Sequence, residues 1–436
     1  MTNSVLRLGN SGDDSRKIEV LDGPESRLPG ARYWLTVVLL LAALFRLWRL
    51  DRNGYGNRYY SAGVRSMLES WHNFFFNSFD PAGFVSLDKP PVAFWIQVLS
   101  AKVLGFSGVS VLLPQAVEGV AAVAVLYGMV RRGFGPRAGL LAAFFLAITP
   151  ISIADDRSSN ADSCLVLVLL LAAWALLGAA RTGSLVSLLT SAIVLGIGFN
   201  VKMLAAFIVL PVFIVIYVVY APLKLSRRLV DITIAGTVLA AVSLSWTAAY
   251  DLTAPDRRPF VGSSVDNSMM ELVLGHNGFQ RFVRPSSPGP ETTQAASTQQ
   301  ASAVAAEASD SLVPPGPFRL LDPRLSSQIG WFLPLVVLGA CLMLQQGATR
   351  LHADSAFWLG WLVIYGGVYS GLTRVPPYYL NTLVPAVAAL AGIGGTALWT
   401  GIADRRRGLL WLSAMLLSIA VWQAYVETGF FRQEAS

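Results

Sequence analysis

The residues best suited to chemistry in this sequence are Asp88 and Lys89, in the segment SLDKPP at positions 86–91. A proline restricts the residue before it to extended backbone and is itself tolerated in the first turn of a helix. The two prolines therefore hold an acid and a base side by side at the start of a helix. Such a carboxylate can accept a proton or bind a cation, and the ammonium group can bind an anion. The alternatives are a carboxylate stabilised by the helix dipole and a lysine that extends along the membrane interface.

Three more charged residues lie at the outer ends of apolar segments. Lys202 ends one such segment, and Arg374 precedes the sequence VPPY. Asp162 opens another segment, after a polar stretch. The two cations are candidates for binding an anionic group or for anchoring the chain at the interface, and Asp162 is a candidate for a helix-start role. Asp155 and Asp156 are predicted to be solvated loop charges, with contact to a metal or to the acceptor as the alternative.

The elements that must position these residues are transmembrane helices. Of the 436 residues, 54% are hydrophobic and 14% charged, with a mean hydropathy of +0.54. Apolar runs near the length of about 20 residues that crosses a bilayer recur along the chain. They predict an all-α integral membrane protein with about eleven transmembrane helices. The predicted spans are residues 33–50, 110–130, 137–153, 162–180, 184–199, 203–220, 229–250, 328–346, 355–372, 379–400 and 408–427.

The basic residues between these spans indicate the orientation. Every short loop on one side carries arginine or lysine, as cytoplasmic loops do. These residues are Arg131, Arg132, Arg137, Arg181, Lys224, Arg227, Arg228, Arg350, Arg405, Arg406 and Arg407. The net charge of +7 therefore reflects membrane orientation rather than nucleic-acid binding. The N-terminus is predicted to be cytoplasmic, and the polar residues 1–32 to be a disordered tail rather than a signal peptide.

Two of the outer segments are long. Residues 51–109 contain apolar and aromatic side chains at helical spacing, which predicts amphipathic helices lying in the membrane interface. The alternative for residues 92–105 is another short span. Residues 251–327 include the tract 285–317, whose Ser, Ala, Thr, Gln and Pro content predicts disorder. Residues 33–436 are otherwise predicted to form one membrane domain.

Several motifs together resemble those of the dolichyl-phosphate-mannose-type glycosyltransferases, the family 39/83 group with the GT-C fold. That group includes protein O-mannosyltransferases and the aminoarabinose transferases that modify lipid A. The DKPP block within a large first outer loop is the most specific match, and the resemblance covers about Arg46 to Gly395. The other matching stretches are NGYGN at 53–57 with Tyr59 and Tyr60, TPIS at 149–152 leading to Asp162, GFNVKML at 198–204, GHNG at 275–278 with Arg281 and Phe282, and PYYL at 377–380 leading to Pro385.

This resemblance implies an enzyme of the cell inner membrane. It would transfer a sugar from a polyprenyl-phosphate donor to a lipid, glycan or protein acceptor on the outer face, with inversion at the anomeric carbon. The resemblance implies catalytic roles for Asp88 and Asp162, donor-phosphate contacts from Lys89, Lys202, Arg374 and Arg58, and a substrate cavity lined by Tyr59, Tyr60, Asn200 and Tyr378.

A divalent metal is an open alternative. The resemblance implies Asp88 and His276 as ligands, the histidine in a patch similar to the His-x-x-Arg-Phe of the aminoarabinose transferases but two residues longer. Two ligands do not define a zinc site. The other histidines are interpreted as structural, and Cys164 and Cys341, both in apolar runs, as small buried hydrophobes.

One departure bears on the mechanism. Relatives carry Asp-Glu before the aromatic pair of the first outer loop, whereas this chain has Gly56 and Asn57. Asp88 or Asp162 would then supply the missing acid, unless the subgroup uses other residues or the protein is an inactive assembly subunit. A transporter of lipid-linked sugars is the further alternative. It would place charges deep in its spans, whereas the charges here gather at the outer boundary.

Overall fold

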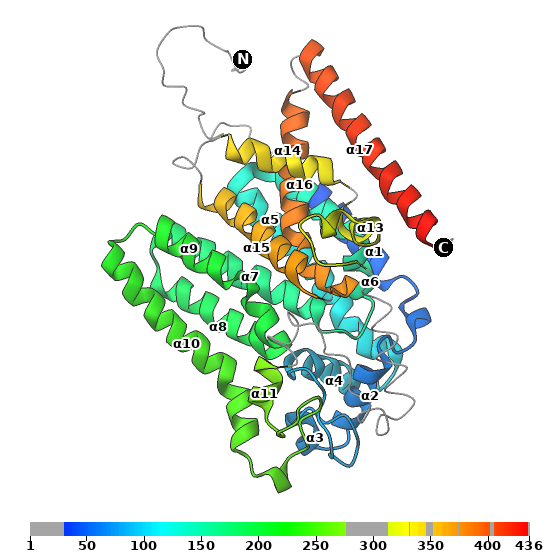
Figure 1. The fold of residues 1–436 in the computed structure, drawn as a ribbon, viewed down its shortest axis with the longest axis vertical. Helices are drawn as coiled ribbons and strands as arrows, with labels where there is room; N and C mark the ends of the chain where they lie inside the picture. The colour runs from blue at the N-terminus through cyan, green and yellow to red at the C-terminus, as the bar shows by residue number, and fades with distance from the viewer. Residues whose placement is uncertain are drawn as a thin grey trace.

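A computed structural model of the chain describes residues 30–275, 313–330, 332–345, 352–373, 375–401 and 405–434 (Figure 1). His276, Arg374, residues 1–29 of the predicted tail and most of the tract 285–317 lie outside these ranges. Residues 313–317, the end of that tract, pack against the bundle, where the amide of Gly316 donates to the carbonyl of Ser370 at 3.0 Å.

The described part of the chain is an all-α membrane protein whose helices follow the predicted spans in order. Their bounds are α1 (Ala31–Leu47), α5 (Gly108–Ile148), α7 (Asp162–Thr182), α8 (Leu185–Lys202), α9 (Leu210–Tyr220), α10 (Leu225–Leu252), α14 (Leu333–Leu344), α15 (Ala353–Gly371), α16 (Val384–Gly401) and α17 (Arg405–Glu434). Within the described ranges, four helical stretches are long and apolar enough to cross a membrane: Gly108–Ile148, Asp162–Thr182, Leu185–Tyr220 and Leu225–Leu252. The bent pair α13 (Pro323–Ile329) and α14 can be a fifth. The count of about eleven stays a prediction.

Two of the long stretches contain chain reversals. In α5 the backbone leaves the helical conformation at Gly135, where φ is 85°. The chain then turns back and packs on the first half of α5, because a Cβ added to Gly139 would lie only 2.9 Å from the carbonyl oxygen of Tyr127. The second break falls at Met203, where φ is 49°. Lys202, the last residue of α8, lies beside the start of α7. Leu223, which follows α9, lies at the other end of α7, because a Cβ added to Gly183 would be 3.0 Å from its side chain. Helices α8 and α9 therefore run in opposite directions, as the predicted spans 184–199 and 203–220 require.

Residues 51–109, predicted to be the first outer loop, form a separate layer at one end of the bundle (Figure 1). It contains η2 (Leu50–Asn53), α2 (Arg58–Met67), α3 (Trp71–Phe75) and α4 (Val92–Leu104). Residues of the second long outer segment, η4 (Pro255–Arg257) and α11 (Met269–Leu274), join this layer. Helix α4 begins directly after Pro91 and packs through Phe94 and Val98 on Val64 of α2. It is one of two shorter apolar helices in the described residues.

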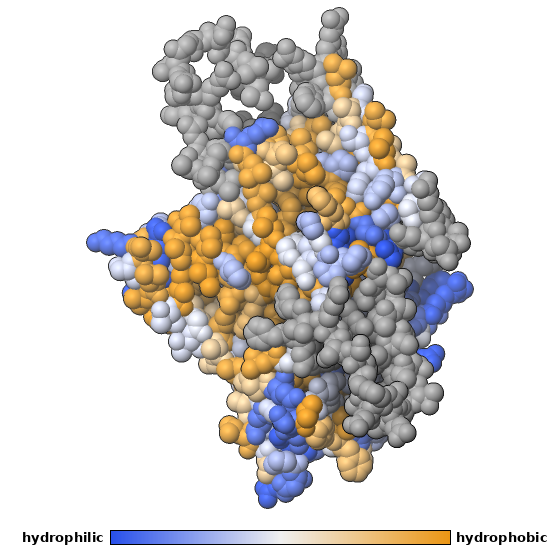
Figure 2. All heavy atoms as spheres, in the orientation of Figure 1, coloured by the Kyte–Doolittle hydropathy of each residue, from blue (hydrophilic) through white to orange (hydrophobic). Residues whose placement is uncertain are grey.

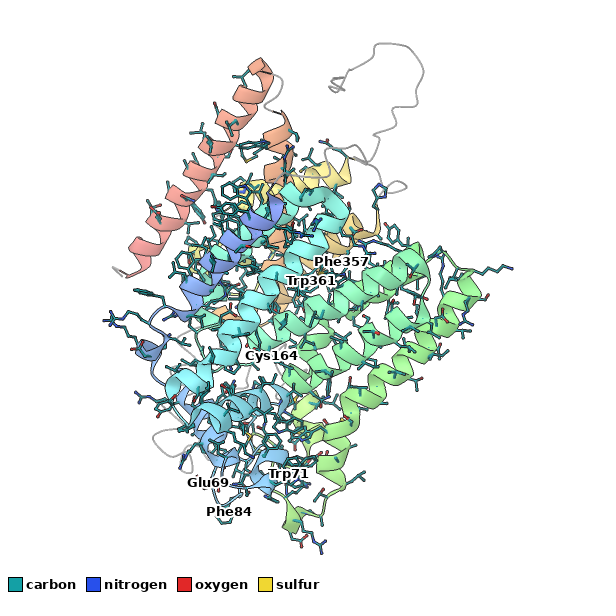
Figure 3. All side chains as sticks on the ribbon, turned by 180° about the vertical axis from the view of Figure 1, so that it is seen from behind. Glu69, Trp71, Phe84, Cys164, Phe357 and Trp361 are labelled. Atoms are coloured by element: carbon teal, nitrogen blue, oxygen red, sulfur yellow. The ribbon has the colours of Figure 1, made fainter. Side chains whose placement is uncertain are left out.

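Further short helices pack against the bundle. They are α6 (Pro150–Asp155), η3 (Met203–Val209), η6 (Arg319–Leu321), α13 and η8 (Pro377–Thr382). The indole of Trp246 in α10 donates to the carbonyl of Phe75 at 2.9 Å, which fixes α10 against the layer. In Figure 3, Cys164 near the start of α7 lies between the layer, marked by Glu69, Trp71 and Phe84, and the bundle core at Phe357 and Trp361.

The surface agrees with a membrane protein. Figure 2 shows hydrophobic residues over the bundle and hydrophilic residues at the turn between α9 and α10 and at the end formed by α3 and α11. Cys164 is buried as predicted, but the prediction for Cys341 is wrong, because this residue is exposed on apolar α14. Hydropathy alone does not distinguish a helix face in the core from one at the surface.

Candidate functional site

The motif residues Asp88 and Lys89 form an ion pair. Their charged atoms lie 2.5 Å apart, and the two side chains are 16% and 8% exposed. Asn77 fixes the backbone of this segment, because its side-chain amide donates to the carbonyl of Lys89 at 2.8 Å and its carbonyl accepts from the amide of Leu87 at 2.9 Å. The pair is therefore held at the entrance of α4, with the cation and the anion adjacent.

A second ion pair joins Asp162, the first residue of α7, to Lys202, the last residue of α8. Both side chains are buried, at 3% and 7% exposure. The ammonium of Lys202 lies 4.9 Å from the ring centre of Tyr378 and 4.5 Å from that of Tyr379, which is cation–π distance. No side chain caps α7 at Ala161. The carboxylate of Asp162 thus faces a buried cation rather than its own helix end, and Lys202 points inward rather than along the interface.

Tyr60 of α2 links the two pairs. Burial raises the pKa of its phenol well above the ordinary value, and the charges of Asp88, Tyr378, Tyr59 and Asp162 raise it further. Burial and the carboxylate of Asp88 likewise raise the pKa of Tyr59. One phenol thus lies within electrostatic reach of both predicted acids. The structure brings Asp88, Asp162, Lys202, Tyr59, Tyr60 and Tyr378 into one region, below the outer layer.

The prediction that Asp155 and Asp156 are solvated is wrong, because each is only 3% exposed. Asp155 accepts from the amide of Asn381 at 2.8 Å and from that of Asn160 at 3.3 Å. Burial, and next the carboxylate of Asp162, raise its pKa well above the usual range, while Lys202 acts in the opposite direction. The turn η8, more than two hundred residues later in the chain, covers this loop, so local polarity could not reveal the burial.

Arg46 is the partner of Asp156 and was missed. Its guanidinium Nε lies 2.7 Å from the carboxylate, and its side chain is fully buried. Burial raises the pKa of Asp156, and Arg46 lowers it. The available signal was an arginine inside the predicted span 33–50, since charged residues within spans usually face partners in the bundle. This pair anchors the loop that carries Asp155 and leads to Asp162.

Asn200 lies at a groove rather than beside the ion pairs. Its amide donates to the carbonyls of Gly196 and Val242, each at 3.0 Å. The groove has a volume of about 360 Å³. It is lined mainly by apolar and aromatic side chains from α3, α4, α8 and α10: Phe75, Pro91, Val92, Trp95, Ile197, Asn200, Val242, Ser245, Trp246 and Ala249. One residue separates its wall from each lysine, Val201 between Asn200 and Lys202 and Pro90 between Pro91 and Lys89. An apolar channel thus adjoins the charged region.

Of the remaining predicted residues, the structure describes Arg58, which is exposed at the start of α2. Arg374 and His276 lie outside the described residues, so the proposed metal pair of Asp88 with His276 stays a prediction. Within the part of the chain that the structure describes, no three His, Cys, Asp or Glu side chains gather in a geometry that could hold a metal ion.

The structure explains the departure at Gly56 and Asn57. Gly56 has a φ of +62°, and a Cβ there would lie 2.9 Å from the amide nitrogen of Ser159. Asn57 caps α2 by accepting from the amide of Tyr59 at 3.1 Å and donates to Asn160 at 3.3 Å. The first loop therefore approaches the loop of Asp155 through a glycine backbone, where an acidic side chain does not fit.

We expect Gly56→Ala to destabilise the protein more than Gly54→Ala. Both glycines have positive φ, at 62° and 57°, so each substitution carries the same backbone penalty of about 1–2 kcal/mol. Only at Gly56 does the added carbon meet another chain segment, since nothing lies within 4 Å at Gly54. The clash should add about 1–3 kcal/mol. Thermal unfolding of the two detergent-solubilised variants measures the difference, and equal melting temperatures would contradict this account.

The fold is shared with solved membrane glycosyltransferases. ArnT from Cupriavidus metallidurans bound to undecaprenyl phosphate matches with a TM-score of 0.60 and 18% identity, over 90% of this chain and 63% of that one. The archaeal oligosaccharyltransferase AglB from Archaeoglobus fulgidus, in complex with an inhibitory peptide and a dolichol-phosphate, matches with a TM-score of 0.51 and 14% identity, over 92% and 55%. The architecture is thus that of the GT-C glycosyltransferases.

Sequence comparison gives the family within this class. The family model "Dolichyl-phosphate-mannose-protein mannosyltransferase" matches residues 88–246. Two Bacillus subtilis (strain 168) proteins are similar: "Putative mannosyltransferase YkcB", 36% identical over 84% of this chain, and "Putative mannosyltransferase YycA", 33% identical over 92%. The chain spans 62% and 69% of their respective lengths. It belongs to this family of membrane glycosyltransferases.

Proposed function

We propose that this protein transfers a sugar from a polyprenyl-phosphate donor to an acceptor at the outer face of the inner membrane, with inversion at the anomeric carbon. The observation that carries the proposal is the pair of buried lysine–carboxylate contacts beside an apolar groove. The arginine-rich loops on the opposite side support this orientation, with the N-terminus in the cytoplasm.

The donor phosphate would bind between Lys89 and Lys202. The leaving group of the transfer is an anionic lipid phosphate, and preorganised cations stabilise the charge that develops on it. Both lysines are largely buried, so their attraction to an anion is stronger than it would be in water. Arg374 is proposed as a further phosphate contact.

The acceptor hydroxyl would lose its proton to Asp162, while Asp88 orients Lys89. In the step, the acceptor O–H bond breaks and its oxygen bonds to the anomeric carbon. The bond from that carbon to the phosphate oxygen breaks, its electron pair stays with the phosphate, and the proton passes to the carboxylate. One displacement of this kind inverts the configuration. Asp162 is favoured as the base because its carboxylate is buried at the start of α7 beside Lys202, which binds the donor phosphate in this proposal.

The groove between α4, α8 and α10 would hold the first isoprene units of the donor. Its aromatic and aliphatic walls suit a prenyl chain, and Asn200 lies at its polar side. The lipid would therefore enter from the bilayer with its phosphate next to the lysines.

Filling this groove should weaken donor binding selectively. We expect Ser245→Trp to raise the KM for a polyprenyl donor about ten-fold. The indole would displace about two methylene groups of the prenyl chain from the groove, and burial of each contributes about 0.8 kcal/mol to donor binding. Thr237→Trp, at an exposed position two turns earlier in α10, is the matched control. Donor titration of initial rates measures the effect, and an unchanged KM in Ser245→Trp would exclude this groove as the prenyl site.

The function itself is tested with purified protein and a radiolabelled polyprenyl-phosphate mannose, the sugar named in the relatives. Cleavage of the donor with transfer of the label supports the proposal. Movement of intact donor across proteoliposomes identifies a transporter, and neither result, with donor binding retained, identifies an inactive subunit. Lipid, glycan and peptide fractions of the envelope serve as acceptors in parallel reactions.

A further inference from the structure

Two arginines in the turn after α1 carry charge that the protein itself does not balance. Arg49 and Arg52 begin and end this turn, and both are exposed. Within the part of the chain that the structure describes, neither side chain forms an ion pair or a hydrogen bond, although Asp51 lies between them. They lie on the side of the bundle opposite the arginine-rich loops, so the orientation rule does not account for them.

The turn that carries these arginines lies where two helices of the bundle end. It follows α1 directly, and it packs on the first residue of α5, because a Cβ added to Gly108 would overlap the carbonyl oxygen of Gly54. Trp48, between α1 and the arginines, is 67% exposed. Exposed tryptophan and arginine at the end of an apolar helix are typical of the level of the lipid headgroups.

The backbone of this turn is strained and held in place. Arg49 has a φ of 51°, a left-handed conformation that residues with a Cβ rarely adopt. The guanidinium of Arg157 maintains it by donating to the carbonyls of Phe45, Trp48 and Arg49 at 3.0, 2.9 and 3.2 Å. Such strain persists only where the surrounding structure enforces it, and it is common where ligands bind. The turn therefore presents its two arginines from a rigid base.

An uncovered apolar face adjoins the arginines. Leu99 and Val103 of α4 lie one turn apart and are 56% and 82% exposed. The end of α4 meets the arginine turn through the stacked rings of Phe106 and Tyr55, whose centres lie 5.3 Å apart. Cations beside an apolar helix face match the two parts of an anionic phospholipid, its charged headgroup and its acyl chains.

We propose that Arg49 and Arg52, together with the exposed apolar face of α4, form a binding site for anionic phospholipids of the leaflet on this side of the membrane. The arginines bind the phosphate of the headgroup, and α4 lies along the acyl chains. Lipid bound in this way anchors the layer formed by residues 51–109 to the bilayer. The inference does not depend on the proposed transfer reaction.

Fluorescence quenching measured at α4 tests this inference. A fluorophore attached to Val103→Cys, in a Cys341→Ser background that lacks the exposed native cysteine, reports the lipids next to this face. The protein is reconstituted in phosphatidylcholine vesicles with increasing fractions of either phosphatidylglycerol or phosphatidylcholine brominated in the acyl chains. We expect the phosphatidylglycerol to bind about five-fold more tightly or better, because each cation near an anionic leaflet contributes about that factor.

The double variant Arg49→Gln with Arg52→Gln should reduce this preference to less than about two-fold. Arg257→Gln, which removes an exposed arginine of η4, is the control and should keep it. The two lipids are compared within each variant, so a change in stability does not imitate the result.

Equal quenching by the two lipids when both arginines are present would overturn the inference, and so would an unchanged preference in the double variant. Binding of soluble polyphosphate through the arginines, without a preference for phosphatidylglycerol, would assign them to an anionic polymer and overturn it as well.

Discussion

Lys202→Ala should lower sugar transfer by about 100-fold or more, which is the usual cost of removing one preorganised group that stabilises a developing anion. The donor loses a buried cation at its phosphate, and the tyrosine rings of η8 lose the ammonium they cover. The measurement is the initial rate of label transfer from the polyprenyl donor. Lys102→Ala, at an exposed position near the end of α4, removes a lysine outside the site and should leave the rate unchanged.

The same substitution leaves Asp162 buried without its partner, which costs about 3–5 kcal/mol of stability. A loss of activity could therefore reflect a loss of folded protein. The double variant Lys202→Ala with Asp162→Asn separates the two effects, because it removes both charges. It should recover much of the melting temperature and none of the transfer. Transfer by the single variant at a rate near that of wild type would remove Lys202 from the donor site.

The fold could be predicted because hydropathy reports directly on transmembrane helices. The chain reversals were also within reach, since Gly135 and Pro136 interrupt one apolar run and a lysine interrupts another at position 202. The number of transmembrane spans could not be predicted, because segments such as α14 are short and form a sharp bend with the helix before them. Residues 51–109 form the three α-helices α2, α3 and α4, and the break between α2 and α3 was not predicted. It falls where Ser70 caps α3 and the side-chain amide of Asn73 donates to the carbonyl of Ser66.

The candidate site was predictable where its residues are locally unusual. Asp88 and Lys89 have two prolines after them, and Lys202 is a lysine on the outer side, where lysine is uncommon. Asp155, Asp156 and Arg46 depend on segments far apart in sequence that meet only in the folded bundle. Neither the polar residues of that loop nor an arginine inside a span reveals that the loop is buried against the span. The sequence therefore predicted the proposed phosphate-binding lysines better than the acids around them.

The two predicted catalytic acids should differ in which kinetic constant they control. Asp162→Asn removes the proposed base, and we expect kcat to fall by about 10²–10⁴-fold, the range for general-base catalysis. Donor affinity should be kept or increased, because Lys202 no longer has a buried carboxylate competing with the phosphate. Asp88→Asn removes the partner that lies 2.5 Å from Lys89, so it should act mainly on donor binding and raise KM with a smaller effect on kcat.

Measuring kcat and KM for donor and acceptor in both variants, with Glu69→Gln as the control for loss of an acid elsewhere, distinguishes these roles. A fall in kcat confined to Asp88→Asn would assign the base to Asp88 and reduce Asp162 to a partner of Lys202. The expected pattern has a structural reason in how the two acids are held: the side chain of Asp162 is 3% exposed and pairs with a lysine of another helix, whereas that of Asp88 is 16% exposed and pairs with the next residue in the chain. The charge of Asp88 therefore acts mainly on Lys89 and, through it, on the donor phosphate, while Asp162 lies deeper in the bundle, at the helix ends where the acceptor hydroxyl would meet the sugar.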